Sequence, residues 1–450
     1  MLFSNKLGNT IKNFLPAPFT IAVLLSLATF LLAFFISDNK SEGSHVFEIL
    51  SYWEKGLWNS KMTVFAMQMM LMLVLGHSLA LSRPIKKLID KATYFCSSSE
   101  RAAAIITFST LLVSLFNWGL GLIFGAIFAR KVGEHATRNN IKINYPLVGA
   151  AGYSGMMVWH GGISGSAPIK IAEEGHFLQE KIGIISQSQT VFSLMNIYIS
   201  IALLIILPIT MYLIGKKSQS SIINLIEEEK EESSKPLKIT GAEKLDHSKI
   251  IAYLFGGIIL IFSIYKAFLI PEVVSLKFIT PNFINLLLIA LCVIMHQNFY
   301  NFLMAIDKAI RGASGILIQF PLYFGIMGIM KYSGMIEIMS DFFIEISTKQ
   351  TFPILTFLSA GIVNIFVPSG GGQWAVQGPI IVESAMKIGA SIPKAIMSLA
   401  YGDQITNMLQ PFWALPLLGI TGLKAKEILP YTLILMLVGT CIFIIGLLIF

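Results

Sequence analysis

The sequence predicts an all-α polytopic membrane protein, arranged as an inverted repeat with two re-entrant hairpins and two discontinuous helices. Of its 450 residues, 55% are hydrophobic and only 13% are charged, and the mean hydropathy is +0.72. A soluble domain usually carries about 25% charged residues. The apolar residues gather in segments of about 20 residues, the length that crosses a bilayer as a helix. This composition therefore indicates a chain embedded in the lipid bilayer.

Plain apolar segments predict simple spans, and basic residues between them set their direction. Arg83 and Arg101 bound a basic stretch after the second span, and by the positive-inside rule this stretch and the N-terminus are cytoplasmic. Between the first two spans, a polar segment with Glu48 and Glu54 predicts a loop. With two broken crossings added, we expect nine crossings and an external C-terminus. The predicted simple spans are residues 16–36, 62–81, 192–214, 250–270, 283–299, 314–330 and 431–450.

Residues 102–130 predict the first re-entrant hairpin. The segment is apolar but interrupted by Asn117, Trp118 and Gly119, and basic residues flank it on both sides. A single span would leave one basic end outside, whereas a hairpin that enters from the cytoplasm keeps both inside. At 1.5 Å per residue, its first arm would reach roughly 22 Å, about the middle of the membrane.

Residues 352–388 predict the second hairpin, with its tip at Pro368 and Ser369. Three consecutive glycines follow, and neither proline nor glycine favours a continuing helix. Irregular backbone at membrane depth persists only where protein or a water-filled cavity satisfies its polar groups. The tip therefore indicates a polar site inside the membrane.

Two further apolar segments, residues 146–168 and 395–419, are too rich in glycine, serine and other polar residues for plain helices. We interpret them as discontinuous helices with unwound middles. Asn117 and Asn364 occupy equivalent positions at the two tips, and the arm before the first hairpin is basic where that before the second is acidic. Opposite charge at equivalent positions is expected of an inverted repeat. The halves are residues 1–215 and 250–450, joined by a hydrophilic cytoplasmic linker, residues 216–249.

The two tips and the two unwound segments should meet near the midplane, where inverted-repeat transporters bind substrate and coupling ion. These segments contain no Lys or Arg, so neutral donors and helix N-termini would hold a small carboxylate. Asp403 is a candidate for ion coupling with Thr406, since a carboxylate inside a membrane is costly. The candidate substrate-binding residues are Asn117, Trp118, Gly119, Ser154, His160, Ser164, Asn364, Ser369, Gly370, Gly371, Gly372, Gln373, Gln404 and Asn407.

Structural roles compete with these assignments. Gly and Ser in membrane helices more often serve packing than binding, which favours a packing role for Ser166. For His160, contact with the ligand and a hydrogen-bonded structural role are equally favoured. The concentrated helix breakers around Ser369 favour a site instead. The three cysteines show no CxxC spacing, so no metal site is expected. We expect no catalytic residues, no nucleic-acid partner and no cofactor beyond a coupling H⁺ or Na⁺.

Three motifs resemble the short-chain fatty acid transporter family (AtoE-type), within the wider ion-transporter superfamily. They are residues 367–379, Trp159-His160-Gly161-Gly162 and Tyr401-Gly402-Asp403-Gln404, and the resemblance extends over the whole chain. It implies uptake of short carboxylates such as acetoacetate or butyrate across a bacterial inner membrane. It also implies a homodimeric scaffold and an elevator-like movement of the transport domain.

Other functions remain open at this point. The same architecture serves for dicarboxylates, other small anions or ion antiport. An intramembrane serine protease is a more distant alternative, because Ser154 and Ser164 lie in GxSG sequences with His160 or His296 as a possible base. The inverted repeat argues against the protease, since the second copy has no equivalent serine.

Overall fold

The computed structural model describes residues 18–37, 44–225, 240–270 and 276–450. Within these ranges the chain is almost entirely helical and forms no strand, only an isolated bridge between Ile143 and Ser221. Seven of the described helices are long and apolar enough to cross a membrane. The predicted polytopic all-α class is therefore confirmed. The acidic part of the linker, residues 227–232, and the start of the first span lie outside the described residues.

The first half carries long helices and one fragmented segment. Its elements are α2 (Pro18–Ile36), α3 (His45–Leu57), α4 (Ser60–Ala80), α5 (Arg83–Thr93), α6 (Ser99–Phe116), α7 (Trp118–Arg138), α8 (Tyr145–Tyr153), η1 (Ser154–Met157), η2 (Trp159–Gly161), α9 (Ser166–Lys170), α10 (Gln179–Ile182) and α11 (Leu194–Lys217).

The second half also combines long helices with an interrupted segment. Its elements are α12 (Glu243–Asp246), α13 (Lys249–Phe268), α14 (Pro281–His296), α15 (Phe299–Ile310), α16 (Ser314–Tyr332), α17 (Met335–Ile346), α18 (Phe352–Phe366), α19 (Gly370–Ile388), α20 (Ile392–Thr406), η6 (Asn407–Leu409), α21 (Pro411–Thr421) and α22 (Ala425–Ile449). The inverted symmetry between the halves and the count of nine crossings stay predictions.

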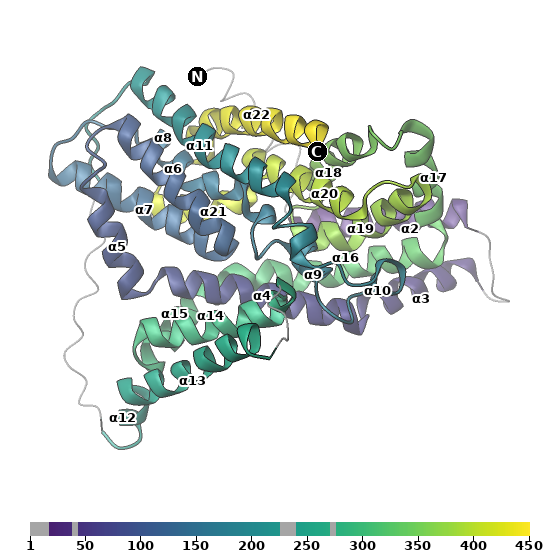
Figure 1. Ribbon diagram of the computed structural model, residues 1–450, viewed down its shortest axis with the longest axis horizontal. Helices are drawn as coiled ribbons and strands as arrows, with labels where there is room; N and C mark the ends of the chain where they lie inside the picture. The colour runs from purple at the N-terminus through teal and green to yellow at the C-terminus, as the bar shows by residue number, and fades with distance from the viewer. Residues whose placement is uncertain (1–17, 38–43, 226–239, 271–275) are drawn as a thin grey trace.

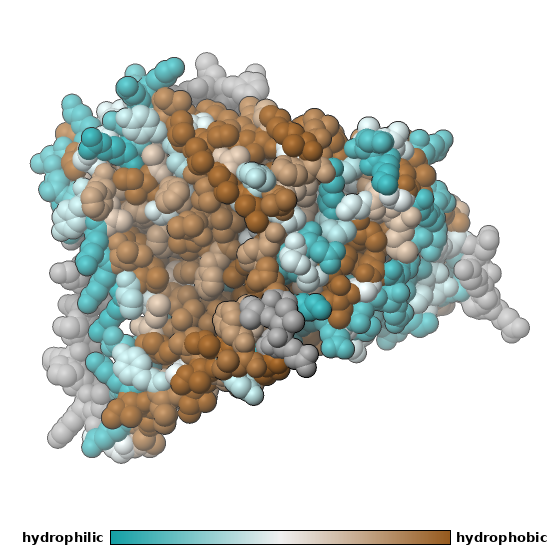
Figure 2. All heavy atoms as spheres, viewed as in Figure 1, coloured by the Kyte–Doolittle hydropathy of each residue, from teal (hydrophilic) through white to brown (hydrophobic). Residues whose placement is uncertain are grey.

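Two groups of helices lie on either side of α4 in Figure 1, and the helices α2, α3 and α16–α20 lie to the right of it in this view. Helices α13, α14 and α15 lie below it in this view, and α6, α7, α8, α11 and α21 lie above it. Helix α4 packs against α14 in the first group and α7 in the second. Apolar residues cover the middle of the visible face, and hydrophilic residues gather toward its left and right edges (Figure 2). Such an apolar surface suits a bundle surrounded by lipid, where helices satisfy their backbone polar groups internally.

Both interrupted segments fold back on themselves at their tips. In the first, an added Cβ on Gly121 would lie 2.8 Å from the Ser114 Cα, and one on Gly125 would lie 2.8 Å from the Thr110 methyl carbon. Small residues therefore let α6 and α7 approach closely. In the second, the Gln373 and Gln377 amides of α19 donate to Ala360 O at 2.9 Å and Ser359 Oγ at 3.1 Å on α18. Their insertion depth in the membrane stays a prediction.

The polar segment between the first two spans was predicted to be a loop, and this prediction is wrong for α3. Residues 45–57 form a helix that packs along α16. Its backbone comes so close that a Cβ on Gly56 would lie 2.8 Å from the Gly328 Cα. Polar residues such as Glu48 alternate with apolar ones at helical spacing, and a search for uniformly apolar segments misses such an amphipathic helix.

Candidate functional site

The first tip uses its polar side chain to cap a helix. Asn117 Oδ1 accepts a hydrogen bond from the Leu120 N–H at 2.7 Å, at the start of α7. Its amide nitrogen donates to Met72 O of α4 at 3.5 Å. A Cβ on Gly119 would lie 3.0 Å from the Leu73 Cα. The tip therefore sits directly against the α4 backbone.

Tryptophans surround the first tip. The Trp118 ring lies 5.4 Å from that of Trp159 and 5.5 Å from that of Trp413, measured between centroids. All three side chains are buried. The Trp118 backbone N–H donates to Ser164 Oγ at 3.0 Å, which ties the tip to the unwound part of the first broken helix. Three elements distant in sequence thus share one aromatic cluster.

The second tip places the N-terminus of α19 inside the protein. Ser369 Oγ caps this helix by accepting from the Gly372 N–H at 3.2 Å. An added Cβ on Gly370 would lie 2.2 Å from His160 Nε2. One on Gly371 would lie 2.7 Å from the Phe320 ring, and one on Gly372 would lie 2.5 Å from the Tyr323 ring. The glycines are therefore required for this close approach.

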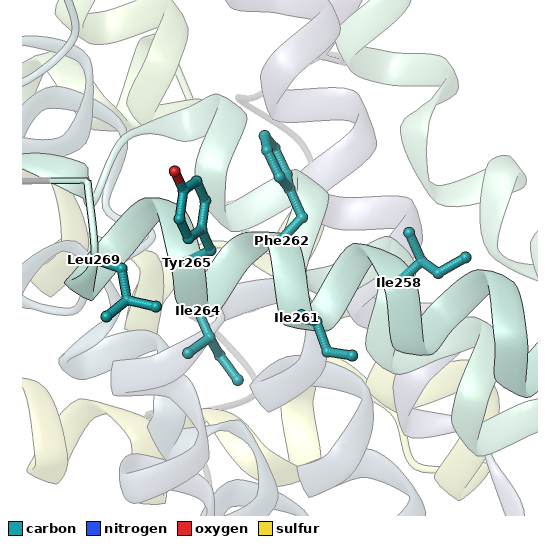
Figure 3. A pocket seen from close by; sticks show the side chains of 6 residues that line it. All are labelled: Ile258, Ile261, Phe262, Ile264, Tyr265 and Leu269. Carbon is teal, nitrogen blue, oxygen red and sulfur yellow. The ribbon is translucent and has the colours of Figure 1, made fainter.

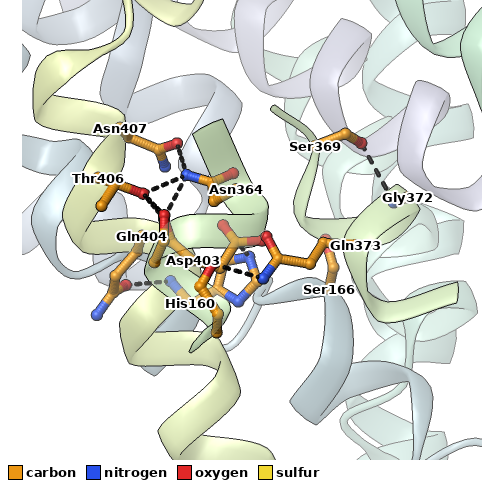
Figure 4. A network of polar contacts seen from close by, with 12 residues as sticks. His160, Ser166, Asn364, Ser369, Gly372, Gln373, Asp403, Gln404, Thr406 and Asn407 are labelled. Atoms are coloured by element: carbon orange, nitrogen blue, oxygen red, sulfur yellow. Dashed lines mark hydrogen bonds and ion pairs between the residues drawn. The ribbon is translucent and has the colours of Figure 1, made fainter. Parts of the chain in front are cut away.

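Asn364 joins the second hairpin to the second broken helix (Figure 4). Its amide nitrogen donates to Asp403 O at 2.6 Å, Thr406 Oγ1 at 2.9 Å and Asn407 Oδ1 at 3.0 Å. In return, Gln410 Nε2 donates to Asn364 O at 2.7 Å. Polar groups at the helix break after α20 are therefore hydrogen-bonded by Asn364, in the last turn of α18.

His160 and Asp403 bring the two broken helices together. The His160 backbone N–H donates to Gln404 Oε1 at 2.9 Å, and His160 Nε2 lies 3.6 Å from Asp403 Oδ1. Both side chains are fully buried. Figure 4 shows Gln373 beside them, with its amide nitrogen donating to Gln377 Oε1 at 2.9 Å.

Unpartnered polar atoms concentrate around these residues. Buried polar side chains are normally hydrogen-bonded, so such a concentration marks a candidate binding site. Donors and acceptors are both represented, which suits an anion together with a proton or cation. Within the described residues, the buried atoms without a hydrogen-bond partner include Trp118 Nε1, Trp159 Nε1, Asn407 Nδ2, both His160 ring nitrogens, Asn364 Oδ1, Gln373 Oε1, Gln410 Oε1 and both Asp403 oxygens.

Among the described residues, neither serine of the GxSG sequences is hydrogen-bonded to a base. Ser154 donates to Ala151 O of its own helix at 2.7 Å, and Ser164 accepts from the tip backbone. His296 instead approaches Ser78 O at 2.8 Å. A serine nucleophile requires a base within hydrogen-bond reach, and across the described residues neither serine has one. No group of three or more His, Cys, Asp or Glu residues in the same ranges is arranged to hold a metal ion.

Sequence reasoning missed a buried ion pair beside the site. Lys170 Nζ lies 2.6 Å from Glu173 Oε2 and donates to Gln68 Oε1 at 3.1 Å. It also lies 5.3 Å from the Phe65 ring centroid, and a Cβ on Gly371 of the second tip would lie 3.2 Å from that ring. A polar residue such as Gln68 within a span was the available signal, because polar groups inside membranes usually have a partner.

A hollow on the protein surface follows α13 (Figure 3). Its lining comes from that helix and the following Leu269, and it is apolar except for Tyr265. Because a carboxylate requires hydrogen-bond donors, this hollow does not suit a small anion. The buried polar cluster remains the candidate site.

Comparison with known proteins gives matches over the full length. Residues 2–450 match the sequence profile of a family described as short chain fatty acid transporter. A relative from Escherichia coli (strain K12) is 36% identical over 445 residues, covering 98% of this chain and 97% of its own. One from Haemophilus influenzae (strain ATCC 51907 / DSM 11121 / KW20 / Rd) is 35% identical over 448 residues, covering 97% of both. Both carry the provisional name short-chain fatty acid transporter.

Two solved structures share the architecture. Neisseria gonorrhoeae MtrF, described within a class of antimetabolite efflux pumps, aligns with a TM-score of 0.62 and 13% identity, covering 97% of both chains. The Alcanivorax borkumensis YdaH transporter aligns with a TM-score of 0.59 and 12% identity, covering 95% of this chain and 97% of its own. At this level of identity the likeness shows the fold alone.

Proposed function

The chain belongs to the short-chain fatty acid transporter family, and on that premise we propose that it moves acetoacetate- or butyrate-like monocarboxylates across the bacterial inner membrane, driven by an ion gradient. The observation that carries this proposal is a buried cluster of donors and acceptors that have no hydrogen-bond partner among the described residues, contributed by the tips and the broken helices. Its relatives are named as transporters, and we propose no catalytic activity.

The donors in this cluster suit one carboxylate. Trp118 Nε1, Trp159 Nε1 and Asn407 Nδ2 have no acceptor within the described residues, and the N-terminus of α19 adds a partial positive charge. The tips and unwound segments contain no Lys or Arg, and Lys170 nearby is already paired with Glu173. A dianion would favour a fixed cation, so the site favours a monocarboxylate, with the tryptophan rings against its short acyl chain.

Asp403 and Thr406 are proposed to serve ion coupling. The Asp403 carboxylate lies at the contact between the halves, and Thr406 Oγ1 donates to Gly361 O at 3.1 Å on α18. An ion bound here would link the second hairpin to the second broken helix. A dicarboxylate carrier or an ion antiporter on this architecture is the second candidate, and the transport assay below separates them.

We propose an elevator-type movement in a homodimer. The hairpins, the broken helices, α11 and α22 would move together against a scaffold that includes α4, α13, α14 and α16. Contacts of α4 with α7 and of α16 with α19 would form the sliding surface. Alternate positions of this surface would expose the site to either side of the membrane.

The first test is transport in proteoliposomes. Labelled acetoacetate uptake is measured with an imposed proton gradient and, separately, a sodium gradient, with butyrate and succinate as competitors. Protein-free liposomes provide the control, because a protonated short acid also crosses lipid unaided and accumulates on the alkaline side. We expect gradient-driven uptake above this control that butyrate, but not succinate, inhibits. Uptake equal to the control under both gradients would refute the assignment of these substrates.

A cross-linking experiment tests the movement. Ser166 Oγ of α9 lies 3.6 Å from Met69 Sδ of α4, so a Ser166→Cys/Met69→Cys variant free of the native cysteines should form a mercury bridge between the moving part and the scaffold. This bridge should arrest uptake reversibly. The matched bridge in Ser359→Cys/Gln377→Cys joins two arms of one hairpin, so bridging should leave uptake at the level of the same variant before bridging. Continued uptake by the fully bridged first variant would contradict the elevator movement.

A further inference from the structure

We propose that His160 and Asp403 together carry the coupling ion, that this ion is a proton, and that one proton accompanies each carboxylate. This inference rests on the proposed transport function and specifies its coupling. The pair has one member from each half of the chain, η2 and α20, with Nε2 and Oδ1 3.6 Å apart. Both carboxylate oxygens of Asp403 and both ring nitrogens of His160 lack a hydrogen-bond partner among the described residues.

The pair abuts the second tip, where the substrate is proposed to bind. A Cβ on Gly370 would lie 2.2 Å from His160 Nε2 and 2.6 Å from the Trp159 ring. The Trp159 ring also lies edge-on to the imidazole, with centroids 3.7 Å apart. The imidazole thus lies against Gly370 of the tip and close to Asp403, which Figure 4 shows beside it. A change in the charge of the imidazole would therefore alter the electrostatic potential at the tip.

Charge balance determines how many protons the pair carries. A buried carboxylate without a donor is strongly disfavoured unless it is neutralised. One proton shared between the two groups leaves the pair neutral, either as carboxylic acid and imidazole or as carboxylate and imidazolium. A second proton makes the pair a single cation, which balances the incoming carboxylate. Release of the carboxylate on the other side then releases the same proton and returns a neutral, empty carrier.

Nearby titratable groups are engaged elsewhere. The Tyr153 hydroxyl donates to Asn407 O at 2.9 Å, and the Tyr401 hydroxyl donates to Asn196 Oδ1 at 2.8 Å. On α20, Lys394 precedes Asp403 by nine residues, or roughly 13 Å along the helix. Other titratable side chains on the elements packed against the pair are engaged or distant. Lys170 and Glu173 form an ion pair beside α9, Tyr431 is hydrogen-bonded to Asn144, and Tyr198, Tyr212 and Cys441 face outward. The rest lie toward helix ends: Glu100, Arg101, Lys216, Lys217, Glu383, Lys387, Lys426 and Glu427.

The proposal predicts electroneutral symport. A carboxylate and a proton together carry no net charge, so the initial uptake rate should follow the pH gradient and not the membrane potential. In wild-type proteoliposomes, a pH-sensitive dye should report one proton consumed outside for each acetoacetate taken up beyond the protein-free control. A ratio of zero, or uptake that follows a sodium gradient at equal pH, would overturn the proposal.

The variants Asp403→Asn and His160→Gln test the two members of the pair separately. Exchange of labelled for unlabelled acetoacetate at equal pH requires no net proton movement. In His160→Gln the remaining carboxyl group is neutral with one proton and cannot become a cation, so pH-driven accumulation should fall to the protein-free level while some exchange persists. Asp403→Asn keeps an imidazole that can still gain one proton with each carboxylate, so exchange should persist within about tenfold, whereas the pH profile of accumulation should shift. His77→Gln, which changes a histidine of α4 outside the cluster, should behave as wild type.

The outcomes distinguish this inference from the proposed function. Wild-type protein with neither exchange nor accumulation would refute the transport of these substrates. Wild-type exchange with full accumulation by both variants would refute only the role of the pair. Should Asp403→Asn fail to fold by size-exclusion chromatography, the conservative Asp403→Glu should shift the pH profile of accumulation, and an unchanged profile would overturn the proposal.

Discussion

The buried Lys170–Glu173 pair offers a quantitative test of how dry the region beside the site is. Lys170 Nζ and Glu173 Oε2 are 2.6 Å apart, and their side chains are 3% and 12% exposed. Glu173 also accepts from Gln68 Nε2 at 2.6 Å and from Asn282 Nδ2 at 3.0 Å. This hydrogen-bonded cluster therefore connects α9 and the residues after it with α4 and α14. Replacing Glu173 with Gln preserves the shape of the side chain and one acceptor but removes the charge.

This substitution leaves a buried ammonium without its counter-ion. Removing one partner of a buried ion pair typically costs about 3–5 kcal/mol, which corresponds to at least about a hundredfold in the folding equilibrium. The structure contains a matched control, since Lys181 and Glu383 are also 2.6 Å apart, but the Lys181 side chain is 48% exposed. An exposed pair contributes no more than about 1 kcal/mol. Glu383→Gln should therefore be nearly neutral.

The measurement is unfolding in mixed micelles with increasing SDS, followed by tryptophan fluorescence and circular dichroism. Glu173→Gln should unfold at a clearly lower SDS fraction than wild type, whereas Glu383→Gln should coincide with wild type. Adding Lys170→Met to Glu173→Gln removes both charges and should recover much of the loss. If Glu173→Gln were no less stable than Glu383→Gln, water would be screening the pair and the closed packing around α9 would be refuted.

Three further predictions concern packing, capping and pH. Gly125→Ala would place its Cβ 2.0 Å from Gly152 O of α8 and should destabilise the protein by about 1–3 kcal/mol. Gly257→Ala, with open space around it, should be neutral, and equal SDS-unfolding midpoints would contradict the close packing of α7 against α8. Ser369→Ala and Ser391→Ala each remove an N-cap worth about 1 kcal/mol, but only the first should reduce acetoacetate uptake; equal uptake would place Ser369 outside the site. Burial lowers the pKa of His176, in the loop after α9, below its usual value of 6.5. The neutral imidazole therefore supports the fold above pH 6.5, and this stability is lost as the pH falls through the lowered pKa. Hydrogen exchange of this loop, corrected for intrinsic rates, should quicken at about pH 5, and unchanged protection would refute this prediction.

The long apolar helices and the positions of the helix breaks were predictable from the sequence because both depend on local chemistry. Uninterrupted apolar residues specify a span, whereas Asn117 and Ser369 favour N-cap positions and Pro368 lacks a backbone N–H. The structure accordingly begins α7 at Trp118 and α19 at Gly370. The amphipathic α3 escaped prediction, since its helical character depends on which face meets α16.

The composition of the site was harder to predict because it depends on distances between segments far apart in the chain. Motifs around residues 160 and 403 suggested a shared site, yet no local pattern specifies that His160 approaches Asp403 rather than a serine. The use of Asn117 as a helix cap was equally hidden, because one side chain can either cap its own helix or reach a ligand. The Lys170–Glu173 spacing suggests a pair, but burial by Gln68 and Asn282 comes only from tertiary packing.

The two halves of the chain contribute different polar groups to the candidate site. At the first tip, Asn117 caps α7 and donates to the α4 backbone. Asn364 instead donates to the break after α20, and its side-chain oxygen has no hydrogen-bond partner among the described residues. The first broken helix contributes the imidazole and the second the carboxylate. Two like groups could not share a single proton at neutral charge, so under the proposed mechanism this difference between the halves would allow one buried site to take up a proton and an anion together.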